Sequence, residues 1–208
     1  MVERDDIRRA YDELAETYAT GRSETGEDTK ILAEFLDAFP DGSRILDAGC
    51  GPGVPVLRRV NASATGYGLD FSRVQLKLAA ENVPDAPLLQ ADVVHLPLDD
   101  DVVDGIVAYH SLIHVPTTDQ QATISEFARI LRPGGRLLLS AGPTEWTGAN
   151  PDWLDSGVEM RWDIAGAEAT RTHLRAAGFV LTDEWDVAED EHWLFLAARL
   201  DNEVEIGT

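Results

Sequence analysis

The residues with the clearest chemical signature lie in the run 45–54 (ILDAGCGPGV), where an acid precedes a turn with a glycine at every second position. The apolar start of the run predicts a short buried strand, and Asp47 stands at its end. Gly49, Gly51 and Gly53 permit backbone conformations and a close backbone approach that a Cβ atom would obstruct. The run therefore predicts a strand that ends in a loop suited to a nucleotide-type cofactor.

The spacing of these glycines separates two kinds of cofactor loop. The pattern here is G-x-G-x-G, whereas the dinucleotide fingerprint is G-x-G-x-x-G. The spacing therefore argues against a nicotinamide dinucleotide. A glycine-rich turn taken alone also fits an ordinary connection between a strand and a helix.

Acids recur at the ends of three successive predicted strands, at Asp47, Asp70 and Asp92. Asp70 lies 21 residues after Gly49, and an acid at this distance, at the tip of the second strand, accepts hydrogen bonds from ribose hydroxyls in open α/β sheets. Each acid taken singly could instead cap the helix that follows it. Their repetition favours a cofactor site at one edge of the sheet.

The motifs DAGCGPG, LD followed by FS, QAD, and RILRPGGRLLLS occur in this order between residues 31 and 140. In this order they resemble the motifs of class I S-adenosylmethionine-dependent methyltransferases, in particular the small-molecule type that includes the ubiquinone and menaquinone biosynthesis enzymes. The N-terminal Y-x-x-x-A-x-x-Y segment of that type is matched by Tyr11, Ala15 and Tyr18. The resemblance implies S-adenosyl-L-methionine as cofactor, S-adenosyl-L-homocysteine as product and a small-molecule acceptor.

The resemblance also assigns parts of the cofactor to residues of this chain. The glycine loop faces the methionine part, Asp70 takes the ribose diol, Phe71 lies against the adenine, and Asp92 and the N–H of Val93 bond to it. For Phe71 the alternative is a plain core aromatic. The residues placed around the cofactor are Tyr18, Asp47, Gly49, Cys50, Gly51, Gly53, Asp70, Phe71, Ser72, Asp92, Val93 and Tyr109.

Methyl transfer from a sulfonium requires alignment more than a dedicated nucleophile, so the catalytic candidates are few. The fourth strand ends in AYHSLIHVP, at the edge where ligands of such sheets bind. His110 could take a proton from a hydroxyl, amine or thiol, and the alternative is a histidine that lines the pocket or bonds to backbone. His114 resembles a residue common in this loop of the family, which favours a structural role.

The segment 142–166 is a 25-residue connection that holds three of the five tryptophans. Loops of that length in compact domains are usually functional. By resemblance, this segment and the N-terminal helix close over the acceptor, although the tryptophans could instead anchor a surface excursion to the core. The residues predicted to line the acceptor pocket are Tyr11, His114, Trp146, Trp153, Arg161 and Trp162.

Alternating strands and helices predict an α/β fold with a doubly wound, mostly parallel sheet. The predicted strands are 44–48, 65–70, 87–91, 103–109 and 135–140, followed by a hairpin of 179–185 and 192–199, and the predicted helices are 4–18, 29–39, 54–60, 120–131 and 167–177. The resemblance adds a Rossmann-like sheet of seven strands with an antiparallel C-terminal strand. His173 is expected on an exposed helix face.

The length of 208 residues fits one domain. Within residues 1–208 we predict a helical cap (1–40), a cofactor-binding core (41–141), an acceptor-site lid (142–166) and a C-terminal helix with a hairpin (167–208). The stretch 20–28 is polar and glycine-broken, and we expect it to be mobile.

Charge excludes one class of partner. The chain has two lysines and 15 arginines, and its net charge is −21. It therefore carries an acidic coat that repels nucleic acid. At molar salt the Debye length falls to about 3 Å and such a coat is tolerated, which favours a halophilic cytoplasm over an unusually acidic mesophilic enzyme.

Cys50 is the only cysteine, so no intramolecular disulfide forms, and no metal-type cluster is predicted. The charged start and the lack of a long apolar run predict a cytoplasmic protein that does not insert into membranes. Two alternatives to a methyltransferase remain, a non-catalytic cofactor-binding regulatory module and a nicotinamide-dependent oxidoreductase. The sequence leaves open the acceptor, the choice of O, N, S or C methylation, and the oligomeric state.

Overall fold

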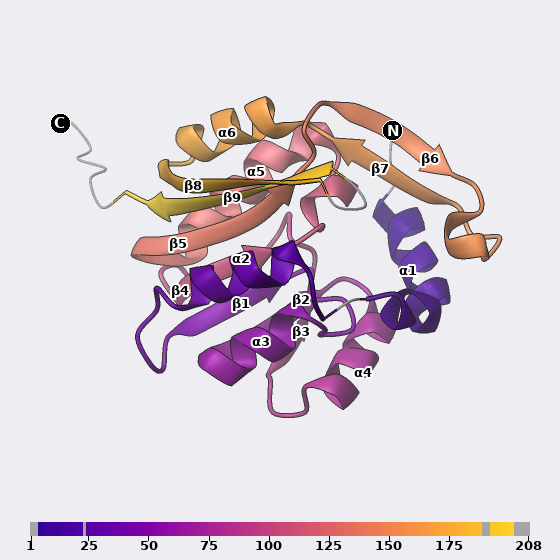
Figure 1. Ribbon diagram of the computed structural model, residues 1–208, viewed down its shortest axis with the longest axis horizontal. Helices are drawn as coiled ribbons and strands as arrows, with labels where there is room; N and C mark the ends of the chain where they lie inside the picture. The colour runs from indigo at the N-terminus through magenta and orange to yellow at the C-terminus, as the bar shows by residue number, and fades with distance from the viewer. Residues whose placement is uncertain (1–3, 23, 189–191, 202–208) are drawn as a thin grey trace.

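A computed structural model describes residues 4–22, 24–188 and 192–201. Its centre is a seven-stranded sheet in the order β3-β2-β1-β4-β5-β9-β8 (Figure 1). The strands are β1 (Arg44–Ala48), β2 (Thr65–Asp70), β3 (Leu88–Gln90), β4 (Val103–Ala108), β5 (Leu131–Ala141), β8 (Phe179–Ala188) and β9 (His192–Leu200). The first five are parallel, and β9 lies antiparallel between β5 and β8. The predicted doubly wound sheet with an antiparallel C-terminal strand is confirmed.

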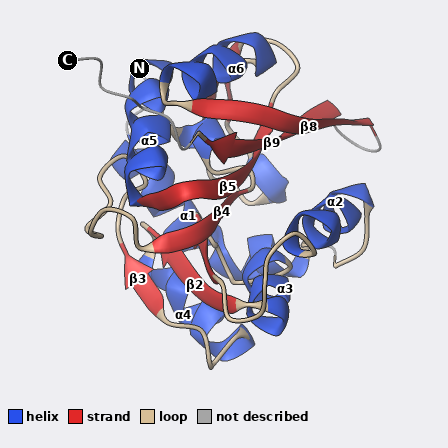
Figure 2. Cartoon of the chain, turned by 90° about the vertical axis from the view of Figure 1, so that its left-hand side faces the viewer, coloured by secondary structure: helices blue, strands red, loops and turns tan. Residues whose placement is uncertain are grey.

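Helices cover both faces of the sheet (Figure 2). On one face lie α2 (Glu27–Leu36), α3 (Val56–Ser63) and α4 (Arg73–Asn82), and on the other α5 (Thr117–Ile130) and α6 (Ala167–Ala176). Helix α1 (Arg4–Thr20) stands apart at one end of the sheet, as Figure 1 shows, and packs on α4. None of the helices in the described part of the chain is long and apolar enough to cross a membrane.

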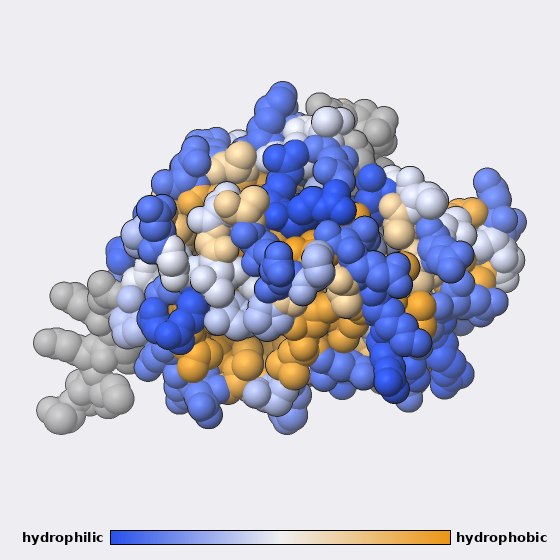
Figure 3. Space-filling model, turned by 90° about the horizontal axis from the view of Figure 1, so that it is seen from below, coloured by the Kyte–Doolittle hydropathy of each residue, from blue (hydrophilic) through white to orange (hydrophobic). Residues whose placement is uncertain are grey.

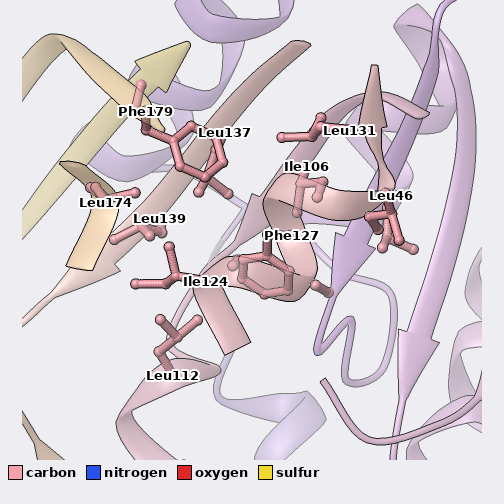
Figure 4. Close-up of a cluster of buried hydrophobic side chains, with 14 of the residues drawn as sticks. Leu46, Ile106, Leu112, Ile124, Phe127, Leu131, Leu137, Leu139, Leu174 and Phe179 are labelled. Carbon is pink, nitrogen blue, oxygen red and sulfur yellow. The ribbon is translucent and has the colours of Figure 1, made fainter. Parts of the chain in front are cut away.

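Apolar residues on alternate sides of the strands build the core on both faces. Leu46 of β1 and Ile106 of β4 belong to the cluster that includes Ile124 and Phe127 of α5 (Figure 4). Ile45, which precedes Leu46 on β1, belongs to the cluster under α2 and α3. Successive strand residues point to opposite faces, so a strand buried on both faces is apolar throughout. The adjacent buried apolar residues Ile45 and Leu46 of β1 and Ile106 to Ala108 of β4 are therefore the signature of central parallel strands.

The parallel register brings the strand ends to one edge. Asp47 on β1 pairs with Gly68 on β2 and with Val107 on β4, and Asp70 pairs with Gln90 on β3. The residues that follow these strands, the glycine loop among them, therefore meet at the same edge, which is where ligands of open α/β sheets bind.

The segment 142–166 differs from the predicted loop, because it forms a second, two-stranded sheet. β6 (Trp146–Asn150) pairs antiparallel with β7 (Met160–Ile164), and a short 3-10 turn, η2 (Trp153–Asp155), lies between them. Asp163 ties this hairpin to the core, since its carboxylate accepts hydrogen bonds from the Thr117 N–H (3.0 Å) and the Thr147 hydroxyl (2.8 Å). In Figure 1 the hairpin and α1 lie at the same end of the molecule.

Two further details differ from the sequence prediction. Helix α5 already ends at Ile130, and the Pro133–Gly135 turn lies within β5, where the register with β4 shifts. Gly134 has φ 78°, and a Cβ on Gly135 would lie 2.8 Å from the Arg132 carbonyl oxygen. His173 is half-buried instead of exposed, because α6 packs against α5. The connection of the C-terminal hairpin was predicted over 186–191, but β8 extends to Ala188. Residues 189–191 and 202–208 lie outside the described residues.

Candidate functional site

Two adjoining cavities open at the carboxyl edge of the sheet. The first, of about 620 Å³, lies over the glycine loop and the ends of β2 and β3, and the second, of about 1630 Å³, lies under the β6–β7 hairpin. Both volumes include space open to solvent. The side chains that border both cavities are Tyr11, Tyr18, His110 and His114. A molecule in the first cavity therefore meets a molecule in the second at these four residues.

The first cavity is bordered by most of the residues predicted for the cofactor. These are Tyr18, Gly49, Gly51, Asp70, Phe71, Asp92, Val93 and Tyr109. Asp47 and Cys50 instead border a smaller cavity beside the glycine loop, together with Arg22. Tyr109 lies between the two, and its hydroxyl donates to the Asp28 carbonyl oxygen (3.1 Å).

The three glycines of the loop have different tasks, although all have positive φ (86°, 52° and 80°). A Cβ on Gly49 would lie 2.5 Å from the Ser111 Cβ, and one on Gly53 would press on Ala79 at 3.3 Å. Gly53 therefore packs against α4 and borders neither the first cavity nor the smaller one beside the loop, and its cofactor role stays a prediction. A Cβ on Gly51 would meet only side-chain atoms at 3.7 Å or more, so Gly51 is the glycine that leaves the cavity open.

Asp70 holds the loop and the start of α4 in place. Its carboxylate accepts hydrogen bonds from the N–H groups of Gly51 and Ser72, both at 2.8 Å. Burial raises the pKa of Asp70 to about 6, and the two N–H groups oppose that rise. Ser72 caps α4 through the Gln75 N–H, and its hydroxyl donates to Asp12 on α1 (2.6 Å). Ser72 thus links α4 to α1 and borders no described cavity, and its cofactor role stays a prediction.

Asp47 is 1% exposed, and its Oδ2 atom has no hydrogen-bond partner among the described residues. Burial, and then the charge of Asp70, raises the pKa of Asp47 to about 8. Burial also raises the pKa of the Cys50 thiol, so this cysteine is not a thiolate nucleophile.

Unpaired buried polar atoms mark what the cavities would bind. Besides Asp47 Oδ2, the Gln75 Oε1 and Ser111 Oγ atoms are buried without a partner in the described structure, and both side chains border the first cavity. Such atoms are costly unless a ligand or water satisfies them. A polar ligand with a sugar and an amino-acid end fits this arrangement.

The outer end of the first cavity is closed by an ion pair. Arg4 of α1 lies 3.0 Å from the Asp92 carboxylate, whose other oxygen accepts from the Val94 N–H (3.0 Å). Phe71 is half-buried there, with its ring centroid 6.3 Å from that of Tyr11. The predicted adenine residues are therefore brought together, with Arg4 as an additional neighbour.

His110 lies at the border of the two cavities in a strained conformation, with φ 54°. Its N–H donates to the Ser140 hydroxyl (2.7 Å), and its ring stacks edge-on against Trp193 at 4.7 Å. Burial lowers the pKa of His110 to about 3. No described residue forms a hydrogen bond with its ring, so nothing in the structure orients it as the predicted base.

His114, by contrast, is held at both ring nitrogens. Its Nε2 lies 2.8 Å from the Tyr11 hydroxyl, and its Nδ1 lies 3.0 Å from the Arg161 carbonyl oxygen. Burial lowers the pKa of His114 to about 4, so the ring is neutral at pH 7. His114 thus joins α1 to the β6–β7 hairpin across the junction of the cavities.

The second cavity has an aromatic wall, as predicted. Trp146, Trp153 and Trp162 border it, and Trp153 contacts Tyr11 and Tyr18 at centroid distances of 5.8 and 5.7 Å. Arg161 is the exception among the predicted pocket residues. Its side chain pairs with Glu159 and borders no described cavity, while its carbonyl oxygen bonds His114.

Four residues that border these cavities were not predicted from the sequence, namely Arg4, Arg22, Gln75 and Ser111. Gln75 had a local signal, because Ser72 and Gln75 form the S-x-x-Q pattern of a capping box. Arg22 had none, since it lies in a polar stretch that follows α1. Its guanidinium lies 5.4 Å from the centre of the Tyr18 ring and borders the second cavity and the small one beside Asp47.

The chain is similar to known methyltransferases in sequence. Residues 46–139 match a family model described as a methyltransferase domain. Methyltransferase GfsG of Streptomyces halstedii is 42% identical over 127 residues, which cover 57% of this chain and 44% of that protein. The 27-O-demethylrifamycin SV methyltransferase of Amycolatopsis mediterranei is 38% identical over 162 residues, 71% of this chain and 58% of that protein. The chain thus spans about half the length of these relatives.

Solved structures show the same fold. The 1,6-didemethyltoxoflavin-N1-methyltransferase of Burkholderia thailandensis, solved with S-adenosylhomocysteine, has a TM-score of 0.73 at 19% identity, covering 95% of this chain and 88% of that one. The [4+2]-cyclase SpnF has a TM-score of 0.75 at 21% identity, covering 95% and 97%.

The sheet order, the glycine loop and the acids at the strand ends define a Rossmann-like nucleotide-cofactor fold. With the methyltransferase domain matched over residues 46–139, the chain has the fold of class I S-adenosylmethionine-dependent methyltransferases.

Proposed function

We propose that this protein transfers a methyl group from S-adenosylmethionine to a small, largely aromatic or apolar acceptor. The observation that carries the proposal is the junction of the two cavities. Glycine backbone, buried acids and unpaired polar atoms surround the first cavity, tryptophans surround the second, and four side chains border both. That geometry suits a direct transfer between two bound molecules.

The cofactor supplies a methyl group already activated on a sulfonium. In the proposal, Asp70 accepts hydrogen bonds from the ribose diol, and Phe71, Asp92 and Val93 surround the adenine. Arg22 and the unpaired Asp47 Oδ2 border the same small cavity, so a guanidinium and a buried carboxyl oxygen are available to the carboxylate and the ammonium of an amino-acid end.

The second cavity restricts the acceptor. In a chain with 38 acids, no Asp or Glu borders this cavity in the described structure. The wall is made of tryptophan and tyrosine rings, and His110 and His114 are neutral because burial lowers the pKa of each. A planar acceptor that is neutral or anionic suits this wall better than a cation, because no Asp, Glu, Lys or Arg other than Arg22 borders the cavity in the described structure.

One alternative is a reaction other than methyl transfer. The [4+2]-cyclase SpnF has the same fold, and the fold therefore does not determine the reaction. A non-catalytic cofactor-binding module is the other alternative. Both would bind the cofactor at Asp70 and neither would transfer the methyl group, so turnover distinguishes them from a methyltransferase. The cytoplasmic location and the halophilic setting remain predictions from the acidic, lysine-poor composition.

Calorimetry with S-adenosylhomocysteine tests the site. We expect micromolar affinity, and a loss of 10- to 100-fold in Asp70→Ala, because charged hydrogen bonds of about 1.5–3 kcal/mol are removed. NAD should not bind. Asp85→Ala, an exposed acid after α4, is the matched control and should bind as the parent does. Unchanged affinity in Asp70→Ala would exclude Asp70 from the site, and methyl transfer to an acceptor panel then tests the activity.

A further inference from the structure

The hydrogen bonds of His114 have a definite direction. The Arg161 carbonyl oxygen, 3.0 Å from Nδ1, can only accept, so Nδ1 must carry a hydrogen. A neutral imidazole has a single N–H, and no carboxylate contacts this buried ring in the described structure, so Nε2 is an acceptor. The Tyr11 hydroxyl, 2.8 Å away, therefore donates its only proton to His114.

This arrangement fixes the Tyr11 oxygen at the junction of the two cavities. Tyr11 is 9% exposed, and its ring stacks edge-on against Tyr18, His114 and Trp153 at centroid distances of 5.2, 5.2 and 5.8 Å. It borders both cavities. With its proton committed to His114, the oxygen offers only lone pairs, which the neighbouring Tyr18 side chain and a bound molecule can share.

We propose that the Tyr11 oxygen accepts a hydrogen bond from the very atom that is methylated, and that the enzyme therefore selects acceptors whose reacting atom is an O–H or N–H group. This inference rests on the proposed methyl transfer. It excludes tertiary amines and pyridine-type nitrogens, which have a lone pair and no hydrogen. The reacting nitrogen of such an acceptor would place its lone pair against the lone pairs of the Tyr11 oxygen. Neither atom would then have a hydrogen-bond partner in the contact, which is costly in a buried site.

The same chain of hydrogen bonds gives the proton a destination. As the acceptor oxygen or nitrogen forms its bond to the methyl carbon, the carbon–sulfur bond breaks and its electron pair stays on sulfur. The acceptor proton passes to the Tyr11 oxygen while the Tyr11 proton passes to His114 Nε2. The imidazolium keeps its Nδ1–H on the Arg161 carbonyl oxygen and releases the extra proton to water, because burial disfavours its charge.

The direction of the bonds can be measured without an acceptor. In protein labelled with ¹⁵N-histidine and saturated with S-adenosylhomocysteine, we expect His114 to be neutral between pH 6 and 8, with hydrogen on Nδ1. Tyr11→Phe should move the Nε2 resonance to the position of an unprotonated ring nitrogen that accepts no hydrogen bond. Tyr67→Phe removes a hydroxyl from the strand β2, away from both cavities, and should leave the resonance unchanged. Hydrogen on Nε2 would overturn the proposal.

The selectivity is tested with acceptors that share one ring and differ in the reacting group, namely a phenol, a secondary aniline, a dimethylaniline and a pyridine. We expect the phenol and the secondary aniline alone to be methylated. Tyr11→Phe should lower kcat 10- to 100-fold with S-adenosylhomocysteine affinity within about threefold, and Tyr67→Phe should keep the parental kcat. Comparable turnover of the dimethylaniline or pyridine, or a parental kcat in Tyr11→Phe, would overturn the proposal. Cofactor binding without turnover of any acceptor would instead contradict the proposed methyl transfer.

Discussion

Two neighbouring carboxyl groups, Asp47 and Asp70, are buried at the edge of the sheet with pKa values raised to about 8 and about 6. Each binds its proton more tightly in the folded protein than in the unfolded chain, where an aspartate has a pKa near 3.9. Folding therefore takes up protons between about pH 4 and pH 8. The stability that the ligand-free protein draws from these groups is greatest below pH 4 and falls as the pH rises toward 8.

Asp47→Asn should remove part of this dependence. We expect the variant to melt several degrees above the parent at pH 8, because no buried charge has to form, and the difference to vanish near pH 4. A change of 1 kcal/mol corresponds to about 2–4 °C in a chain of this size. Melting temperatures of the ligand-free pair, followed from pH 4 to 8, give the result. A constant difference across that range would mean that Asp47 does not titrate as its burial implies.

At the residue scale, local motifs predicted many of the residues that gather at the first cavity, but not the long-range partners of these residues. The positions of Gly49, Asp70 and Asp92 follow from strand ends and glycine spacing, which a short window of sequence contains. The ion pair of Arg4 with Asp92 and the bond of Tyr11 to His114 depend on how α1 packs across the sheet. The sequence separations are 88 and 103 residues, and no local pattern records them.

At the scale of elements, the β6–β7 hairpin and α1 together border the second cavity. Trp153, between the two strands, contacts Tyr11, Tyr18 and Trp162, but borders only the second cavity. We therefore expect Trp153→Ala to raise the acceptor KM at least tenfold while S-adenosylhomocysteine affinity stays within about threefold. Removing a packed indole from a protein core costs about 3–5 kcal/mol of free energy. This free energy is larger than the loss of acceptor binding that a tenfold rise in KM represents.

Trp185→Ala is the matched control for this prediction. Trp185 packs on the cluster under α2 and borders neither cavity, so its loss should lower the melting temperature without changing KM. Equal effects of the two substitutions on KM would mean that Trp153 acts through general stability and that the acceptor lies elsewhere.

Strands were easier to predict than the hairpin for a physical reason. The ranges 44–48 and 65–70 coincide with β1 and β2, because each holds buried apolar residues directly before an acid, Asp47 or Asp70. The exposed residues of β6 do not alternate between polar and apolar, so its pairing has no periodic signal. What holds it is Asp163, through bonds to α5 and to Thr147.

For the whole molecule, the acidic coat sets the conditions of folding. Hydrophilic side chains cover much of the face seen in Figure 3, and the net charge is −21. We expect the melting temperature to rise steeply between 0.1 and 3 M KCl, because the Debye length shortens from about 10 Å to below about 3 Å and self-repulsion is screened. Surface ion pairs weaken over the same range, but each contributes only about 0–1 kcal/mol.

Choline chloride at matched ionic strength separates screening from specific binding of K⁺. A similar rise in both salts would support screening. A melting temperature that does not change with salt would contradict the halophilic interpretation of the composition.

The place of β9 between β5 and β8 has a consequence for synthesis on the ribosome. β8 pairs in the sheet only with β9, which is translated after it. A nascent chain that has emerged only as far as β8 therefore has an open edge on β5 and an unpaired strand beside it, and such edges attract other chains. The emergence of residues 192–200 is the event that closes this edge, so translational pausing before these codons would lengthen the time for which the nascent chain depends on chaperones.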